Sequence, residues 1–338
     1  MILLLGASGY MGQAFATELR RRRYSFIPLT RRAINYTDFD LLFDYVRKLR
    51  PEFIINAAGY PGNPNVDACE QAREETLCAN TLLPQTISRV CMMTGTPWGH
   101  ISSGCIYRGA KFIDNGKTRN VVGMELRQLF AAHPEKICGY TEWDEPNFCF
   151  RHPPCNFYSG SKALAEEVIR EAGEAYIWRP GMPFNERNEP RNFLWRIQNY
   201  SKVHDGVNSI THLGDFVRAC LELWERQAPF GIYNITNPGA ILTRKAVETI
   251  QRILKPEQSF DFWRDDGEFY YYGAKALRSN CVLDVSKLLR TGVKMRPVEE
   301  ALEDSLRNWN WEMSPLELAR SQTFSCFRQR SELLSHDL

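Results

Sequence analysis

The chain opens with Ile2-Leu3-Leu4-Leu5-Gly6-Ala7-Ser8-Gly9-Tyr10-Met11-Gly12, and this stretch decides the fold. The four apolar residues predict a short buried strand, and the residues at 11–22 that follow are compatible with a helix. Glycines at this spacing permit a tight turn and let the backbone approach a pyrophosphate, which the N–H groups at the helix start can bind. The stretch therefore predicts a dinucleotide-binding turn, with a purely structural turn as the alternative. Its predicted cofactor contacts are Gly6, Ser8, Gly9, Tyr10, Met11 and Gly12.

The first half of the chain alternates short apolar runs with helical patterns, which is typical of a parallel α/β sheet. The predicted fold class is α/β, a Rossmann-type doubly wound parallel sheet with a smaller C-terminal substrate-binding subdomain. Further strands are predicted at 24–29, 53–56, 98–102 and 176–179, and further helices at 39–49, 80–93, 161–170, 215–225 and 244–254.

The pattern also predicts a division of the chain. We expect a dinucleotide-binding Rossmann domain at 1–181, to which 206–236 returns, a mainly substrate-binding subdomain at 182–310, and a C-terminal tail at 311–338. Residues 108–154 lose the periodicity and are rich in glycine, proline and polar side chains, so we interpret them as an insertion or a long loop over a site.

Composition excludes some classes of protein. The 338 residues carry a net charge of +2, which gives no reason to expect nucleic acid as a partner. No stretch approaches the roughly 20 apolar residues that would span a bilayer, so no membrane partner is expected either. The ten cysteines follow no regular framework of pairs, which favours free thiols and a cytoplasmic location.

The end of the second predicted strand indicates which cofactor is bound. An acidic residue there would accept hydrogen bonds from a ribose diol, but this chain has Thr30-Arg31-Arg32. Because arginine pairs well with phosphate, Arg31 and Arg32 favour NADPH, with NADH still open. The alternative is that both arginines simply point to solvent.

Ser103, Tyr158 and Lys162 have the order and spacing of a ketone-reducing site. Tyr158 and Lys162 lie one turn apart on a predicted helix, so the ammonium can stabilise the phenolate and lower the pKa of the tyrosine. Ser103 would hold the substrate carbonyl while Tyr158 protonates its oxygen and a nicotinamide supplies hydride. A second pair, Tyr271 and Lys275, lies in an aromatic stretch with no clear helix, and we interpret it as packing.

These motifs resemble the extended short-chain dehydrogenase/reductase superfamily, and within it the dTDP-4-dehydrorhamnose reductase branch. A closer resemblance is to the epimerase/reductases that make nucleotide-linked rhamnose from a 4-keto-6-deoxyglucose nucleotide. It covers roughly residues 1–310, apart from 108–140. The runs that carry it are Asn56-Ala57-Ala58-Gly59, Asn65-Val66-Asp67, Cys69-Glu70, Asn80-Thr81, Ser103-Gly104-Cys105-Ile106, Pro146-Asn147-Phe148, Pro190-Arg191-Asn192-Phe193, Asn234, Asn237-Pro238-Gly239 and Arg278-Ser279-Asn280.

The resemblance implies NADPH-dependent reduction of the C4 ketone of a nucleotide-linked 4-keto-6-deoxy sugar, with C3/C5 epimerisation left open. It also implies a homodimer built from the helices near 80–93 and 161–172. Further cofactor contacts are expected at Ala57, Ala58, Gly59, Asn80, Ser102, Tyr158, Lys162, Pro180 and Met182, and substrate contacts at Val66, Asp67, Cys105, Asn192, Arg278 and Asn280. For Arg278 and the two asparagines, surface pairing is the alternative.

Epimerisation needs a group that removes a proton next to the ketone and a way to return it on the other face. The thiol of Cys105 is plausible for this, and the resemblance assigns it that role; a small buried hydrophobe is the alternative. The family has a lysine where this chain has Arg196, and arginine does not deprotonate in proteins. We therefore hypothesise a competent 4-ketoreductase whose epimerase activity is altered or supplied by another residue.

Two other readings stay open. One is a nucleotide-sugar 4-epimerase, in which hydride is taken and returned within one cycle, and the other is a non-catalytic cofactor-binding regulatory subunit. No Asp-Glu pair follows Ser103, which disfavours a 4,6-dehydratase. A soft metal site at Cys138, Cys149, His152 and Cys155 is disfavoured by the neighbouring prolines, so no metal is expected.

Overall fold

The computed structural model describes residues 1–169 and 173–312 of the chain. Its centre is a six-stranded sheet of parallel strands in the order β2-β1-β3-β4-β8-β12, which confirms the predicted fold class. The strands are β1 (Ile2–Leu5), β2 (Phe26–Leu29), β3 (Phe53–Asn56), β4 (Trp98–Ile101), β8 (Ala175–Arg179) and β12 (Gly231–Asn234).

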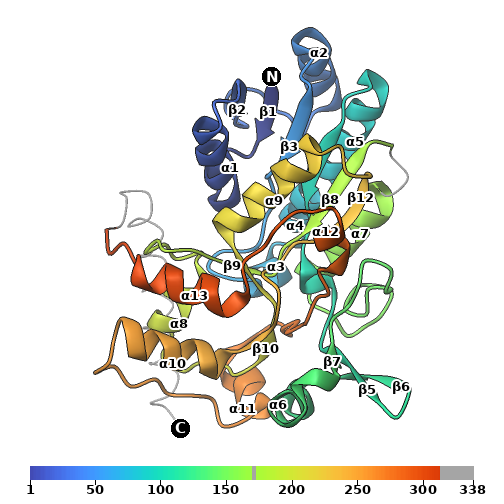
Figure 1. The fold of residues 1–338 in the computed structure, drawn as a ribbon. Coiled ribbons are helices and arrows are strands. Elements are labelled where there is room, and N and C mark those ends of the chain that lie inside the picture. The colour runs from blue at the N-terminus through green and yellow to red at the C-terminus, as the bar shows by residue number, and fades with distance from the viewer. Residues whose placement is uncertain (170–172, 313–338) are drawn as a thin grey trace.

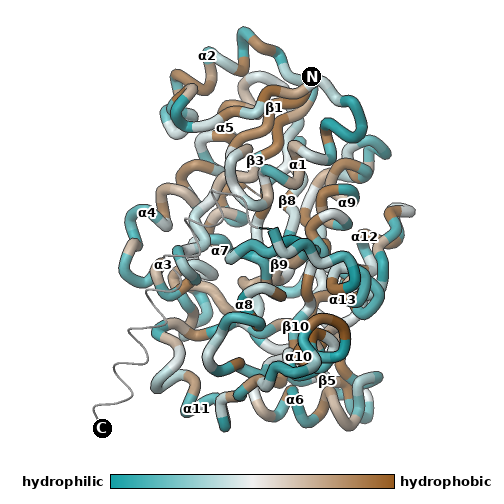
Figure 2. The backbone as a smooth tube through the Cα atoms, turned by 90° about the vertical axis from the view of Figure 1, so that its left-hand side faces the viewer, coloured by the Kyte–Doolittle hydropathy of each residue, from teal (hydrophilic) through white to brown (hydrophobic). Residues whose placement is uncertain are grey.

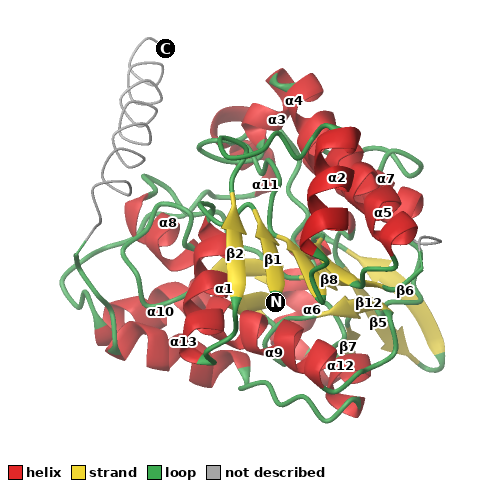
Figure 3. Cartoon of the chain, turned by 90° about the horizontal axis from the view of Figure 1, so that it is seen from above, coloured by secondary structure: helices red, strands yellow, loops and turns green. Residues whose placement is uncertain are grey.

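Helices cover both faces of this sheet (Figure 3). Side chains alternate along a strand, so Ile2 and Leu4 of β1 enter one core while Leu3 and Leu5 enter the other. The first core is covered by α1 (Tyr10–Arg21), α9 (Leu213–Glu225) and α12 (Ser286–Arg290), and the second by α2 (Phe39–Leu49), α5 (Leu83–Thr94) and α7 (Phe157–Ile169).

The chain reverses its winding direction at β1, because β2 pairs with one edge of β1 and β3 with the other. Ligands of open α/β sheets bind at such a switch point, outside the carboxyl ends of the strands. Gly6 leaves β1 with φ +74°, and a Cβ there would lie 2.5 Å from the Ala58 nitrogen. Only glycine fits this close approach of the two strand exits, as the glycine pattern predicted.

The helix predicted at 80–93 is interrupted. A π-helical turn (Cys78–Leu82) joins α4 (Arg73–Leu77) to α5, and it follows the short α3 (Asp67–Gln71). The helix predicted to carry Tyr158 and Lys162 begins at Phe157, because Asn156 Oδ1 accepts the Ser159 N–H at 2.7 Å and the Glu70 carboxylate accepts the Phe157 N–H at 2.7 Å. Tyr158 therefore lies in the first turn of α7.

A second layer lies below the sheet in Figure 1 and has its own apolar core, to which Phe184, Trp195, Ile250 and Leu302 belong. Two small strand pairs, β9 with β11 and β10 with β13, connect it to the rest. Its elements are β9 (Met182–Phe184), α8 (Phe193–Asn199), β10 (Val207–Asn208), β11 (Ile210–His212), β13 (Ile241–Leu242), α10 (Thr243–Ile253), α11 (Asp266–Glu268), a π-helical turn (Phe269–Gly273) and α13 (Val298–Arg307).

Of the two interpretations of residues 108–154, the long loop over a site is wrong for the first part of the segment. This part forms a three-stranded antiparallel sheet with a helix, at the lower end of the molecule in Figure 1 and far from α1. Arg127 on the helix is tied to Asp266 at 2.8 Å. The elements are β5 (Ala110–Asp114), β6 (Lys117–Val121), α6 (Gly123–Ala132), a 3₁₀ turn (Pro134–Lys136) and β7 (Ile137–Cys138). Short polar strands hide their alternation, which explains the miss.

Apolar residues concentrate in the strands of the sheet, and hydrophilic residues lie on the outer helices (Figure 2). None of the described helices combines the length and apolar character that crossing a bilayer requires. The domain ranges stay a prediction, although α9, β12 and α12 all join the main sheet after residue 206. Most of the predicted tail, residues 313–338, lies outside the described residues.

Candidate active site

The fold brings Ser103 and Tyr158 together at the carboxyl end of β4. Ser103 begins a 3₁₀ turn (Gly104–Ile106), and its hydroxyl accepts the Cys105 N–H at 3.1 Å. The same hydroxyl and Cys105 both lie close enough to the phenol of Tyr158 to act on its pKa. Three of the predicted catalytic residues therefore share one site.

Lys162 lies one turn after Tyr158 and is only 5% exposed. Its ammonium donates to the Ile101 carbonyl at 3.1 Å, and burial lowers its pKa to about 8 against the opposing charge of Glu166. A Cβ on Gly59 would lie 3.3 Å from Lys162 Nζ and 3.2 Å from Asn80 Oδ1. The turn at 57–59 therefore runs directly over the lysine, at the switch point of the sheet.

The electrostatics of Tyr158 differ from the sequence-based expectation. Burial raises the pKa of Tyr158 well above its ordinary value, Cys105 raises it further, and the nearby Ser103 hydroxyl lowers it. The net effect is opposite to the lowering expected from Lys162 because the phenolate would lose its hydration in this site. Tyr158 consequently keeps its proton at neutral pH and is suited to donate it.

Asn80 holds the turn at 57–60 against α7. It lies in the π-helical turn with no exposed surface; its Oδ1 accepts the Tyr60 N–H at 2.8 Å, and its amide nitrogen donates to the Tyr60 carbonyl at 2.9 Å. The same nitrogen donates to the Ser161 hydroxyl at 3.2 Å. Asn80 therefore positions the loop that the cofactor would contact, instead of offering a free amide.

The glycine turn fits a pyrophosphate. No side chain caps the N-terminus of α1 at Gly9, and the first turn of α1 contains no acidic residue, so its N–H groups and partial positive charge face outward. A Cβ on Gly12 would lie 2.1 Å from the Gly6 carbonyl, so the helix can approach this closely only with glycine. The side chains of Tyr10 and Met11 are engaged elsewhere: the Tyr10 hydroxyl donates to Asn185 Oδ1 at 3.1 Å, and Met11 packs on the core. Only their backbone groups would therefore contact a pyrophosphate.

Arg31 and Arg32 are exposed at the end of β2, and neither forms an ion pair within the described ranges 1–169 and 173–312. Arg31 and the backbone of Gly6 both lie close enough to Tyr36 to act on the pKa of its phenol. At least Arg31 is thus beside the glycine turn. The donor set suits the 2′-phosphate of NADPH.

Pro180, Met182 and Ser102 are three other predicted cofactor contacts, and two of them adjoin the turn at 103–106, called the catalytic turn below because it carries Ser103 and Cys105. The Pro180 carbonyl accepts the Gly104 N–H at 2.8 Å, so β8 ends beside Ser103. Met182 is partly buried in β9. The Ser102 hydroxyl is buried and donates to Glu166 at 2.5 Å, so its hydrogen bond is made inside the protein.

The predicted substrate residues Asp67 and Arg278 form one bidentate ion pair. Arg278 Nη1 and Nη2 donate to the two Asp67 carboxylate oxygens at 2.7 and 3.0 Å, and the Ala276 N–H reaches the same carboxylate at 2.9 Å. Val66 immediately precedes α3, next to this pair. The Arg278 guanidinium therefore joins α3 to residues 276–278. It binds the Asp67 carboxylate where it had been expected to bind a phosphate of the substrate.

The two asparagines also make internal contacts. Asn192 has no exposed surface, caps α8 by accepting the Leu194 N–H at 3.0 Å, and donates to the Asn185 and Arg187 carbonyls at 2.7 Å each. Asn280 has φ +37° and accepts from the Asn208 amide at 3.3 Å. A structural role explains Asn192 without a substrate contact.

Arg196, which stands where the family has lysine, reaches across to the loop at 60–66. Its Nε donates to the Pro190 carbonyl at 3.0 Å and its Nη2 to the Pro64 carbonyl at 3.4 Å. On the other side of the site, Cys105 is partly buried, and the buried thiol of Cys281 donates to the Gly104 carbonyl at 3.2 Å. Arg196 thus contacts backbone oxygens, where a permanent cation is suited.

Sequence reasoning missed Glu166, Arg179 and Tyr107, which lie behind the site as one buried network. The sequence did contain a signal for this network. An arginine at the end of the apolar run at 176–179 needs a partner if it is buried, and Glu166, one helical turn after Lys162, is a carboxylate that could supply it. Tyr271 of the second Tyr-x-x-x-Lys pair, which was expected to serve packing, contacts the Tyr272 ring with centroids 4.5 Å apart but is 78% exposed.

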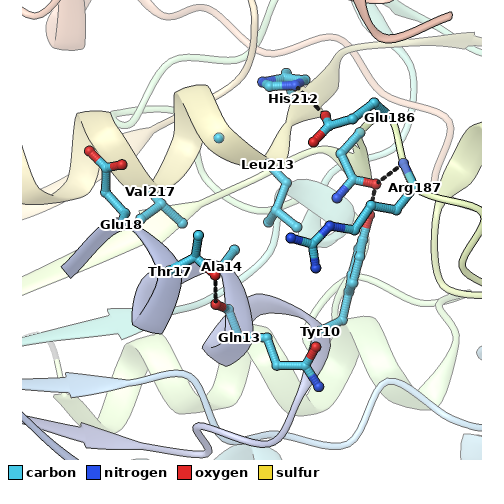
Figure 4. Close-up of a pocket in the computed structure, with 12 residues that line it drawn as sticks. Tyr10, Gln13, Ala14, Thr17, Glu18, Glu186, Arg187, His212, Leu213 and Val217 are labelled. Carbon is cyan, nitrogen blue, oxygen red and sulfur yellow. Dashed lines mark hydrogen bonds and ion pairs between the residues drawn. The ribbon is translucent and has the colours of Figure 1, made fainter. Parts of the chain in front are cut away.

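A surface pocket of about 130 Å³ lies between α1, α9 and the segment at 185–187 (Figure 4). Tyr10, Gln13 and Thr17 line it from α1, and Glu186 and His212 from the opposite wall. Ser103, Tyr158 and Lys162 are not among its lining residues. The pocket is therefore separate from the catalytic turn.

In the part of the chain that the structure describes, no group of three or more His, Cys, Asp or Glu side chains could hold a metal ion. Of the candidates considered from sequence, the Cys149 thiol donates to the Pro146 carbonyl at 3.4 Å, and His152 contacts Glu145 at 3.1 Å.

Comparison with known proteins agrees with this geometry. The family described as RmlD substrate binding domain matches residues 1–310. The chain is 32% identical to a trifunctional UDP-glucose 4,6-dehydratase/UDP-4-keto-6-deoxy-D-glucose 3,5-epimerase/UDP-4-keto-L-rhamnose-reductase (RHM2) of Arabidopsis thaliana, over 76% of this chain and 35% of that protein. It is 30% identical to a bifunctional dTDP-4-dehydrorhamnose 3,5-epimerase/dTDP-4-dehydrorhamnose reductase of the same plant, over 76% of this chain and 77% of the relative. The chain thus spans well under half the length of the trifunctional relatives.

Solved structures share the fold. The L780 UDP-rhamnose synthase of Acanthamoeba polyphaga mimivirus superposes with a TM-score of 0.76 at 21% identity, covering 91% of this chain and 98% of that one. A dTDP-4-dehydrorhamnose reductase of Bacillus anthracis in complex with NADP has a TM-score of 0.69 at 19% identity, covering 91% and 97%.

Proposed function

The chain belongs to the family of the RmlD substrate binding domain, and from this we propose that it reduces the C4 ketone of a nucleotide-linked 4-keto-6-deoxy sugar with NADPH. The observation that carries the proposal is the convergence of Ser103 and a protonated, partly buried Tyr158 at the end of β4, with Lys162 one turn away beside the turn at 57–59. The names of the plant relatives support the same reaction class.

The residues divide the chemistry among them. Bound NADPH supplies hydride to the ketone carbon. Ser103 donates a hydrogen bond to the ketone oxygen, and Tyr158, whose raised pKa keeps it protonated, transfers its proton to that oxygen as the alcohol forms. The Lys162 ammonium stabilises the phenolate that remains until solvent restores its proton. The products are the sugar alcohol and oxidised cofactor.

NADPH is favoured over NADH by Arg31 and Arg32. Both are exposed after the end of β2 and have no acidic partner among the described residues, and Arg31 lies beside the glycine turn. NADH can occupy the same turn with less affinity, because the pyrophosphate contacts do not depend on the 2′ position.

A second activity, epimerisation at C3 and C5, would accompany the reduction. Cys105 lies beside Ser103 and is close enough to Tyr158 to act on the pKa of its phenol. This position suits a group that exchanges protons next to the ketone. Arg196 contacts the Pro64 and Pro190 carbonyls and cannot act as a base. We propose that the chain exchanges protons through Cys105 and that the lysine-dependent step of its family is altered.

We infer a homodimer in the cytoplasm. Leu82 in the π-helical turn, Met93 on α5 and Val168 on α7 are 51%, 60% and 39% exposed. These elements pack on one another, and a second copy would cover the three side chains. All nine described cysteines are free thiols, which supports a reducing compartment. Light scattering of the purified protein tests the dimer.

The function is tested by incubating the protein and NADPH with UDP- and dTDP-4-keto-6-deoxyglucose in separate reactions. We expect NADPH to be consumed in stoichiometry with the sugar alcohol seen by NMR. A 4-epimerase would convert its sugar without net consumption of NADPH, and a regulatory subunit would bind cofactor without turnover. Either result would overturn the proposal. Solvent deuterium entering C3 or C5, and lost in Cys105→Ala, would support the epimerase step.

A further inference from the structure

A fully buried ion pair lies directly behind the catalytic turn. Arg179, at the end of β8, has no exposed side-chain surface, and Glu166 on α7 is 2% exposed. Their closest atoms, Nη2 and Oε2, are 2.5 Å apart, and Nε contacts both carboxylate oxygens at 3.0 and 3.2 Å. Removing two charges from water is costly, and apolar side chains of the same volume are often as stabilising. Stability alone therefore does not explain this pair.

The pair holds both ends of the segment that carries Ser103 and Cys105. At the first end, the Ser102 hydroxyl donates to Glu166 Oε1 at 2.5 Å. At the second end, Arg179 Nη1 donates to the Tyr107 hydroxyl at 3.0 Å. The segment at 103–106 thus spans two contacts to a single buried ion pair.

Further contacts fix the second end. The Tyr107 hydroxyl donates to the Asp144 carbonyl at 2.6 Å, and the ring stacks on Tyr140 with centroids 4.7 Å apart. The Pro180 carbonyl, one residue after Arg179, accepts the Gly104 N–H at 2.8 Å. The end of β8 is therefore tied to the middle and to the far end of the catalytic turn.

We propose that Glu166 and Arg179 are positioning residues of the active site, which clamp the 102–107 segment so that Ser103 and Cys105 are held at Tyr158. Neither side chain touches substrate, because both are enclosed between α7, β4 and β8. Glu166 also shares α7 with Lys162 and acts on its charge. The inference rests on the proposed reduction as the reaction that the clamp serves.

Two small substitutions test the clamp from its ends. Ser102→Ala and Tyr107→Phe each remove one hydroxyl and leave the ion pair paired. We expect kcat to fall by about 10- to 100-fold, the size of effect that a misplaced catalytic group produces, while KM for NADPH stays unchanged. Backbone amide exchange of 103–107 should become faster in both variants. The matched controls are Ser305→Ala and Tyr176→Phe, whose buried hydroxyls bind Ala301 and Ala228 carbonyls away from this turn.

A third variant separates positioning from stability. Glu166→Leu combined with Arg179→Met removes both charges together, so no buried charge is left unpaired. We expect its thermal midpoint to stay at or above that of the wild type while kcat falls. Unchanged kcat and unchanged amide exchange in Ser102→Ala and Tyr107→Phe, or equal losses in the controls, would overturn the clamp. A wild-type protein that consumes no NADPH would instead contradict the proposed function, and the amide exchange would still report on the clamp.

Discussion

Asp67 and Arg278, 211 positions apart in the sequence, form a bidentate ion pair that joins α3 to the segment before Asn280. Both side chains are about one-fifth exposed, so water screens the pair only partly. Asp67 and Arg278 were each expected to contact substrate. In the structure they bind each other instead, next to the turn at 57–66.

Asp67→Asn should destabilise the protein by about 2 kcal/mol, because the substitution weakens two charge-assisted hydrogen bonds of Arg278. The urea dependence of the free energy of unfolding measures this loss. Glu303→Gln is the matched control: its ion pair with Arg252 is exposed on both sides and should contribute less than about 1 kcal/mol. Equal effects of the two substitutions would contradict the structural role of Asp67.

Tyr158→Phe should lower kcat by about 10²- to 10⁴-fold, since it removes the proton donor and leaves the glycine turn intact. NADPH binding, measured by fluorescence titration, should be retained. Tyr271→Phe repeats the change in the exposed tyrosine of the second Tyr-x-x-x-Lys pair and should have no effect. Loss of activity in Tyr271→Phe alone would reverse the assignment of the site.

Stability should depend on pH through Lys162. Burial lowers its pKa in the folded protein to about 8, from an ordinary value of 10.5, so above pH 8 the unfolded chain binds more protons than the folded one. The free energy of unfolding should therefore gain a positive contribution between about pH 8 and 10.5, of at most about 1.4 kcal/mol per pH unit. Comparison of wild type with Lys162→Met by urea unfolding at several pH values isolates it. Parallel pH curves would show that the ammonium is not desolvated.

The rate of reduction should also depend on Lys162, but it should fall with rising pH where the stability rises. As pH rises through about 8, Lys162 loses the charge that stabilises the Tyr158 phenolate, so kcat for reduction should fall. A rate profile that stays flat up to pH 10 would argue against a role for the ammonium.

Replacing Arg31 and Arg32 together by alanine should weaken NADPH binding by about 10- to 100-fold, because one or two charge-assisted hydrogen bonds to the 2′-phosphate are lost. Affinity for NADH should be unchanged. Arg47→Ala, at an exposed arginine of α2 paired with Asp44, is the control. Unchanged NADPH affinity in the double variant would mean that both arginines serve only the surface.

Local pattern predicted a large part of this protein. The glycine spacing identified the turn after β1, since a Cβ at Gly6 or Gly12 would collide with backbone atoms. Helical periodicity found α2 to the residue, and the four-residue spacing placed Lys162 under Tyr158. The sheet of 110–138 escaped because its strands are short and largely polar, and the break in the helix at 78–82 has no simple local signal.

By itself the sequence determined the parallel α/β fold, the dinucleotide turn and the order of the catalytic residues, because these depend on spacing along one or two adjoining elements. Only the tertiary structure decided that Asp67 meets Arg278, that Glu166 and Arg179 clamp the catalytic turn, and that the pKa of Tyr158 is raised instead of lowered. Those properties arise from distant segments meeting where water is excluded, and desolvation there outweighs the charges that spacing alone had indicated.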